Sequence, residues 1–223
     1  MWEILAILLT VGGYAIAKKI STRIPALQPM VVASILVWLI WWLISSDWET
    51  YDRGSSVITF LLGPATVALA IPLARQYKRV LSMWKAIAVG VASGSFVAIV
   101  IVWTVIWIMG GDDLLIRSMI SKSVTTPISV ELTTTIGGIP ALAAVFTAVT
   151  GIVGGMFYRI VMRVSGVTDE WAIGLAVGTS SHAVGTASLI NESQSKAAAS
   201  SLAMILSGII TSLYFIPVQY LLQ

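Results

Sequence analysis

Two stretches that interrupt the apolar sequence gather side chains able to move protons or to bind a small anion. Residues 122–138 contain a glutamate, serines, threonines, a proline and a pair of glycines, and residues 178–191 contain the only histidine, His182, among serines, threonines and glycines. Lipid cannot hydrogen-bond a freed backbone amide, so irregular backbone at membrane depth is buried in protein or lines a water-filled cavity. Polar side chains gathered there are typical of a transporter's substrate site near the membrane midplane.

Two titratable side chains in these stretches have a functional and a structural interpretation. Glu131 is the only one of the ten acids inside an otherwise uncharged apolar segment. It can couple protons to transport or contact a substrate hydroxyl, or it is a buried acid bonded to neighbouring hydroxyls. His182 can carry a proton or donate to an anion; alternatively, Thr179 or Ser180 satisfies its imidazole.

Other chemistries find little support. The chain has no cysteine, which excludes disulfides and thiolate chemistry, and a single histidine without a second nearby ligand argues against a metal site. The run 178–182 does not complete a Gly-x-Ser-x-Gly nucleophile motif, because His182 occupies the last glycine position. We therefore expect neither an enzyme nor a bound cofactor or metal.

Residues 63–66, Gly-Pro-Ala-Thr, predict a break in the third apolar span. The N-terminus of a half-helix offers N–H groups and a positive dipole end to a carboxylate, although a kinked structural helix has the same sequence. Lys122 can hold an anion near the entrance of a site, although an interfacial lysine that extends toward the headgroups is the commoner case. The predicted substrate-binding residues are Thr66, Thr125, Thr126, Ser129, Ser180, Ser181, His182, Gly185 and Thr186; the predicted proton-coupling residues are Glu131 and His182.

Composition places all of these residues in a membrane. Of the 223 residues 57% are hydrophobic and 10% charged, against about 25% charged in a soluble domain. The net charge of +3 follows from cytoplasmic-loop bias and does not indicate nucleic-acid binding. The N-terminus lacks a basic signal-peptide region, so we expect the first span to be retained. Six full spans are predicted: 2–17, 30–44, 57–74, 84–109, 139–161 and 197–222.

The charges of the loops predict the path of the chain. Basic residues cluster near positions 20 and 80 and acids in the intervening loops, so the positive-inside rule places the N-terminus outside. A full crossing by residues 114–136 would put Arg159 and Arg163 outside, whereas a segment that enters and returns keeps them in the cytoplasm. We therefore predict that residues 114–136 form a re-entrant segment. The segment around His182 can enter the membrane from the opposite face.

Weak internal similarity suggests repeated units. A shift of 57 residues lays 125–135 over 182–192 and 150–153 over 207–210. We predict one membrane domain over residues 1–223, made of an N-terminal helical pair (1–56) and a core of broken helices (57–223). Within that core the predicted repeats are 57–110, 114–166 and 171–222, a plan common among transporters.

Four collinear motifs, at residues 61–73, 122–128, 137–142 and 178–187, resemble those of the LrgB/CidB family, and the resemblance covers almost the whole chain. Ser181, where many relatives carry alanine, and Ala74, where an aromatic is frequent, depart from the pattern. The resemblance implies a bacterial plasma-membrane protein with an LrgA/CidA-type holin-like partner, in a family described as modulating murein hydrolase activity and autolysis. Related proteins carry pyruvate in bacteria and glycolate or glycerate in plastids.

The combined prediction is an all-α, polytopic membrane carrier with two broken or re-entrant segments, dimeric and of elevator type. Its predicted substrate is a small 2-oxo or 2-hydroxy monocarboxylate, with proton coupling as an added feature. The alternative is a holin-like pore or regulatory component without a stereospecific site. A pore would favour one continuous polar helix face, whereas polarity here is confined to short broken segments.

Overall fold

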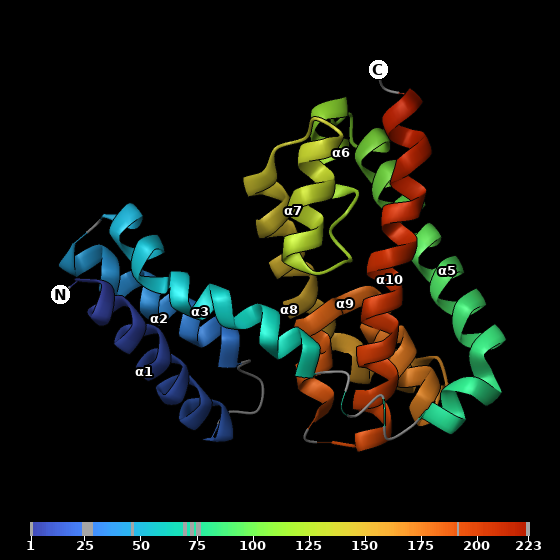
Figure 1. Cartoon of the computed structure of the whole chain (residues 1–223), viewed down its shortest axis with the longest axis horizontal. Coiled ribbons are helices and arrows are strands. Elements are labelled where there is room, and N and C mark those ends of the chain that lie inside the picture. The colour runs from blue at the N-terminus through green and yellow to red at the C-terminus, as the bar shows by residue number, and fades with distance from the viewer. Residues whose placement is uncertain are drawn as a thin grey trace. The chain divides into compact units, whose positions relative to one another are not determined.

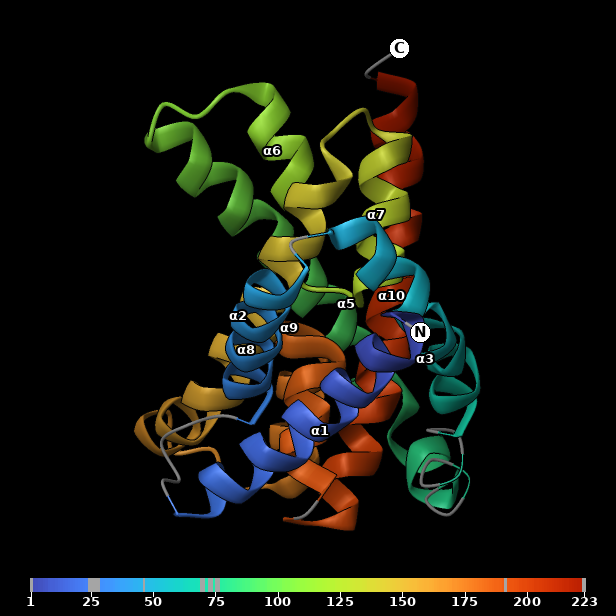
Figure 2. The ribbon, with the colours of Figure 1, turned by 90° about the vertical axis from the view of Figure 1, so that its left-hand side faces the viewer.

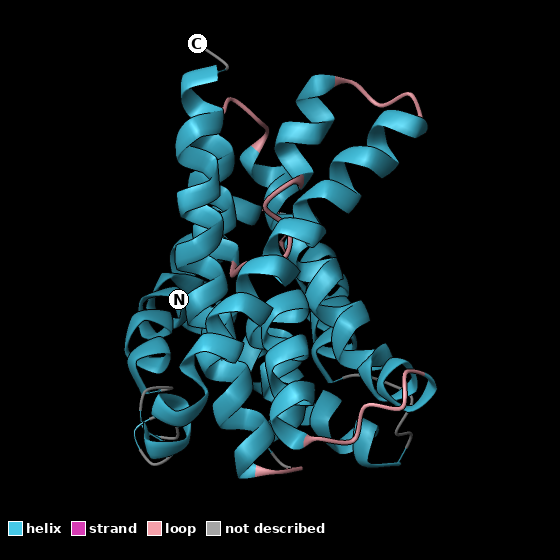
Figure 3. Cartoon of the chain, turned by 90° about the vertical axis from the view of Figure 1, so that its right-hand side faces the viewer, coloured by secondary structure: helices cyan, strands magenta, loops and turns pink. Residues whose placement is uncertain are grey.

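The computed structural model describes residues 2–23, 29–45, 47–68, 71, 74, 77–190 and 192–221, and these residues form helices and connecting loops without a strand (Figure 3). The helices are α1 (Trp2–Arg23), α2 (Pro29–Ile44), α3 (Trp48–Ala68), α5 (Tyr77–Ile108), α6 (Asp113–Met119), α7 (Thr126–Thr135), α8 (Pro140–Val164), α9 (Glu170–Ile190) and α10 (Gln194–Leu221) (Figure 1). The all-helical prediction is confirmed.

Length and hydropathy mark α1, α5, α8, α9 and α10 as long and apolar enough to cross a membrane, with a shorter apolar helix at Val32–Ile44. The chain is therefore a multi-pass membrane protein. It divides into two compact units, Met1–Leu69 and Ala70–Gln223. The predicted repeats remain a prediction.

The first unit is a three-helix assembly in which α1 packs against α2 and α3. Gly54 of α3 permits this packing, because a Cβ there would lie 2.7 Å from the Cα of Glu3. The predicted break at residues 63–66 is wrong within the described backbone, since α3 continues through Pro64 to Ala68. Pro64 removes one backbone hydrogen bond without ending the helix. Thr66 lies on this helix, but the structure does not describe its side chain. Pro72 lies outside the described residues.

In the second unit α6 and α7 form a short helical hairpin. They have seven and 10 residues, so they rise about 10 and 15 Å, roughly half or less of a hydrocarbon core of about 30 Å. Asp112 begins the hairpin as the N-cap of α6, with its carboxylate accepting from the amide of Leu115 at 2.8 Å. Gly137, with φ +75°, makes the turn that leaves it. The hairpin has the form that the predicted re-entrance requires, and its depth in the membrane remains a prediction.

Contacts between the start of α5 and the start of α9 agree with a chain that turns back at the α6–α7 hairpin. Arg79, near the start of α5, lies 3.9 Å from Asp169 and places its guanidinium 5.2 Å from the ring centroid of Trp171, at the start of α9. The chain therefore returns to one face after crossing along α5 and α8. Basic residues at both ends of this path lie on that same face, as the positive-inside argument requires.

Helix α9 folds back at a break, although its length and hydropathy would also allow a crossing, and its predicted entry from the opposite face remains a prediction. It consists of two helical segments, 170–181 and 183–190, that meet at His182, whose backbone is not helical. Tyr158 of α8 packs with Ile173 and Val177 of the first segment and with Leu189 of the second. Both ends of α9 therefore lie near the end of α8. Figures 1 and 2 show α6 and α7 in the upper part of this unit and α9 in the lower part.

Candidate functional site

The α6–α7 hairpin and the break in α9 both contact Thr147, in the first half of α8. The hydroxyl of Thr147 donates to Ser129 Oγ of α7 at 2.9 Å, while the Thr147 carbonyl accepts from His182 Nε2 of α9 at 2.8 Å. One residue of a crossing helix thus joins the tips of both segments. The sequence prediction placed Ser129 and His182 in one site, and in the structure Thr147 joins them indirectly.

A buried hydroxyl cluster fixes the hairpin against α8. Ser121 Oγ lies 2.7 Å from Ser129 Oγ and 2.9 Å from Thr133 Oγ1, and Thr147 completes the group. All four side chains are at most 1% exposed. Because burying a hydroxyl without a partner costs about 1–3 kcal/mol, their mutual hydrogen bonds specify this arrangement of the hairpin.

His182 holds a strained backbone at the break in α9. Its φ of 42° and ψ of −138° make it the only non-glycine residue with positive φ in the described part of the chain. Such a conformation costs about 1–3 kcal/mol and persists only when its surroundings enforce it. Here the enforcing contacts are the bond to Thr147 and a 2.7 Å bond from Thr186 Oγ1 to the His182 carbonyl, with Thr186 also 2.8 Å from Ser200 Oγ.

Glycines on α8 make room for the tip of α9. A Cβ on Gly151 would lie 2.6 Å from His182 Cε1, and a Cβ on Gly154 would lie 1.8 Å from Ser181 Oγ. Gly185 was predicted to bind substrate. It instead faces the first segment of α9, because a Cβ on Gly185 would lie 2.5 Å from the Cβ of Ser181.

A cavity of about 470 Å³, open on one side where Ile101, Val149 and Val153 are exposed, lies where the two tips converge. The turn between α6 and α7 contributes Lys122 and Ser123, and the end of the first segment of α9 contributes Ser180 and Ser181. Thr150 and Gly154 of α8 complete its polar and small side, and apolar residues of α5 and α8 form the rest: Ala98, Ile101, Val102, Val149 and Val153. A smaller cavity of about 220 Å³ shares Gly154, Ser180 and Ser181 and extends to Tyr158.

Apart from Ser180 and Ser181, the predicted site residues whose side chains are described do not line this cavity. Ser129, His182 and Thr186 are buried in the protein. Thr125 and Thr126 are half-buried at the start of α7, and the Thr125 side chain makes no capping bond. Glu131 is exposed on α7, and no described residue makes a hydrogen bond or ion pair with its carboxylate. Glu131 therefore does not join Ser129 and His182 among the buried polar side chains.

Comparison with known proteins decides the family. Residues 10–221 match the LrgB-like family. The chain belongs to the LrgB-like family. The holin-like protein CidB of Staphylococcus epidermidis is 31% identical over 221 residues, covering 98% of this chain and 96% of the relative. The antiholin-like protein LrgB of Bacillus mycoides is 34% identical over 186 residues, covering 82% and 80%.

A third relative of this LrgB-like chain, an uncharacterized protein of Haemophilus influenzae, is 34% identical over 212 residues, covering 92% of this chain and 90% of the relative. No solved structure matches the chain. The resemblance to the LrgB/CidB family seen in four motifs is thus confirmed over almost the full length. The named relatives carry holin-like and antiholin-like descriptions rather than the name of an enzyme.

Sequence reasoning about this LrgB-like chain missed several residues that build the site. Ser121 and Thr147 give no signal, because each is a single hydroxyl within an ordinary stretch and acquires meaning only from its partners on other helices. Gly154 is one of the glycines at positions 151, 154 and 155, and only the structure shows that it faces Ser181. Lys122 lies at the tip of the segment that was predicted to be re-entrant. A charged side chain at that position is a sequence signal for a residue that lines a cavity.

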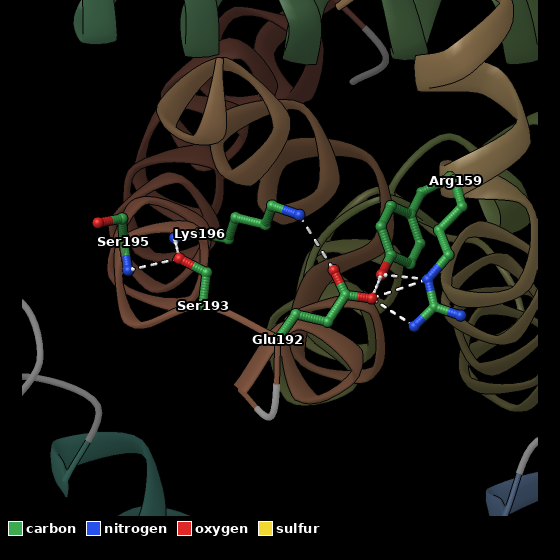
Figure 4. Close-up of polar contacts among 6 residues, drawn as sticks. Arg159, Glu192, Ser193, Ser195 and Lys196 are labelled. Atoms are coloured by element: carbon green, nitrogen blue, oxygen red, sulfur yellow. Dashed lines mark hydrogen bonds and ion pairs between the residues drawn. The ribbon is translucent and has the colours of Figure 1, made fainter. Parts of the chain in front are cut away.

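A cluster of charged residues joins α8 to the start of α10 (Figure 4), and its Tyr158 also lines the smaller cavity. The Glu192 carboxylate accepts from the hydroxyl of Tyr158, from Arg159, whose Nε lies 2.7 Å away, and from Lys196 Nζ at 3.2 Å. Burial alone would raise the pKa of Glu192, but these hydrogen bonds outweigh it and hold that pKa below its ordinary value. The cluster ties α8 to the start of α10, where Ser193 Oγ accepts from the amide of Ser195 at 3.2 Å.

Proposed function

We propose that this LrgB-like protein transports small monocarboxylates of the 2-oxo or 2-hydroxy class across a bacterial plasma membrane. The observation that supports the proposal best is the cavity formed where the α6–α7 hairpin and the break in α9 converge on α8. Transporters bind substrates near the bilayer midplane between such discontinuous helices.

The lining of the cavity suits a molecule of this class. Ser123, Thr150 and Ser181 offer hydroxyl groups that can donate to a carboxylate or to an oxygen on C2. The apolar residues of α5 and α8 suit the carbon atoms beside those oxygens. A pocket with a few polar groups on an apolar wall is the usual form of a small-molecule site.

The transport cycle requires the site to face each side in turn. With α6–α7 entering from one face and α9 from the other, as predicted, each tip separates the cavity from one side of the membrane. We propose that the tips move with the cavity as one body, as in an elevator carrier, and that the protein works as a homodimer with an LrgA/CidA-type partner nearby. The effect on murein hydrolases then follows indirectly from metabolite and proton traffic.

The test is uptake of labelled pyruvate, glycolate and glycerate into proteoliposomes that contain only this protein. We expect saturable uptake that His182→Ala reduces at least about tenfold, because the α9 tip loses its bond to Thr147. A pH gradient applied to wild type and to Glu131→Gln tests proton coupling at that carboxylate. Flux that does not saturate and that extends to unrelated solutes would contradict a carrier and support a holin-like pore.

A further inference from the structure

Lys122 lies at the innermost part of the α6–α7 hairpin, in the turn between the two helices. The seven residues of α6 place this turn about 10 Å below the outer end of the hairpin. Its side chain is half-buried and lines the larger cavity together with Ser123. The ammonium group therefore belongs to the wall of the cavity rather than to the outer end of the hairpin.

The charge of Lys122 is not balanced by the described protein. No ion pair or hydrogen bond joins its ammonium to any described residue, whereas Arg79, Arg117, Arg159 and Lys196 all have carboxylate partners. A lysine at membrane depth is expensive unless it meets water or an anion. The cavity supplies room for either, and its lining contains no acidic residue.

Two hydroxyl groups of the α9 tip line the same cavity. Ser180 Oγ donates to the Ala176 carbonyl at 2.8 Å and lies 3.0 Å from Ser181 Oγ. The proton of Ser181 is therefore available either to Ser180 or to a ligand in the cavity. A cation on one tip and a hydroxyl donor on the other, in a single cavity, form the complement of a carboxylate.

We infer that Lys122 is the counter-charge of the transported anion, with Ser181 as second donor, and that the site selects molecules with one negative charge and no ammonium group. The inference rests on the proposed function and adds its charge selectivity. One lysine neutralises one carboxylate, so a dicarboxylate would leave a second charge unpaired in the cavity. An amino acid would bring an ammonium group that no acidic residue of the lining can accept.

The experiment measures inhibition of labelled pyruvate uptake in proteoliposomes by unlabelled propionate, succinate and alanine. We expect propionate to compete and succinate and alanine to compete at least about tenfold more weakly. In Lys122→Met the apparent KM for pyruvate rises at least about tenfold, whereas Lys85→Met, on the exposed start of α5, keeps the wild-type value. An unchanged KM in Lys122→Met, with saturable wild-type uptake, would overturn the inference while leaving the proposed function intact.

A chemical rescue separates charge from folding. The native chain has no cysteine, so Lys122→Cys can be modified at one position only. We expect a reagent that attaches an aminoethyl group to restore the low KM, and a reagent that attaches a neutral methyl group to leave it high. Equal KM values after both modifications would show that the position matters for shape and not for charge, and would also overturn the inference. Absence of saturable uptake in wild type would contradict the proposed function itself.

Discussion

Gly154→Ala is expected to abolish most transport and to destabilise the protein. The added Cβ would lie 1.8 Å from Ser181 Oγ and 2.6 Å from Ser181 Cβ, so the tip of α9 must move away from α8. Overpacking of this kind costs about 1–3 kcal/mol or more. Because Gly154 and Ser181 line both cavities, we expect the maximal uptake rate to fall at least about tenfold, measured in proteoliposomes at matched protein content.

The matched control is Gly90→Ala, in the interior of α5, where a Cβ would meet nothing within 4 Å. Alanine is favoured over glycine in a helix by about 1 kcal/mol, so this variant should be as stable as wild type and equally active. Adding Ser181→Gly to Gly154→Ala removes the atoms that clash and should recover part of the lost thermal stability. If Gly154→Ala behaves like Gly90→Ala, the close packing of α9 on α8 is wrong.

Glu192→Lys is expected to cause the largest loss of stability among charge substitutions. The Glu192 side chain is 20% exposed and accepts hydrogen bonds from Tyr158, Arg159 and Lys196. The lysine would remove the acceptor of Arg159 and Lys196 and would place a third positive charge beside them. We expect a loss of about 2–3 kcal/mol, less than for a fully buried pair because Arg159 is two-thirds exposed. This corresponds to a fall of roughly 4–12 °C in the midpoint of thermal unfolding in detergent.

Asp113→Asn, which removes the carboxylate paired with Arg117, provides the comparison. Asp113 is 67% exposed, so its loss should cost no more than about 1 kcal/mol. Equal midpoints for Asp113→Asn and Glu192→Lys would contradict a stabilising role of the cluster.

Wild type should also lose stability in acid, because the pKa of Glu192 is depressed in the folded protein. The contribution of Glu192 to the free energy of unfolding is present above the ordinary pKa of 4.5. It disappears as the pH falls through the folded pKa. Glu192→Gln should lack that component.

Much of the fold could be predicted because charge and helix-breaking residues act locally. The basic residues around positions 80 and 160 constrained residues 114–136 to return to the face they entered, and Pro127 with the pair of glycines allowed it. Glycines on both sides of His182 indicated the break in α9 in the same way. Pro64 shows the limit of such signals: proline weakens a helix, but α3 continues through it.

The site was predicted less completely because its geometry depends on contacts between helices distant in sequence. Thr147 joins Ser129 and His182 only because α8 passes between the two tips. Glu131 was a natural candidate by its position in an uncharged segment, yet the helical period places it on the exposed side of α7, away from the buried Ser129 and Thr133.

The most direct test of a substrate site between the two tips is protection of a single cysteine by substrate. Ser180→Cys lines the larger cavity and Ser165→Cys lies on an exposed loop, and neither competes with a native thiol. We expect pyruvate to slow modification of Ser180→Cys by a small maleimide with a concentration dependence that matches the KM for uptake, and to leave Ser165→Cys unchanged. Equal modification rates with and without saturating pyruvate at Ser180→Cys, in a protein that still transports pyruvate, would place the substrate elsewhere and contradict the account.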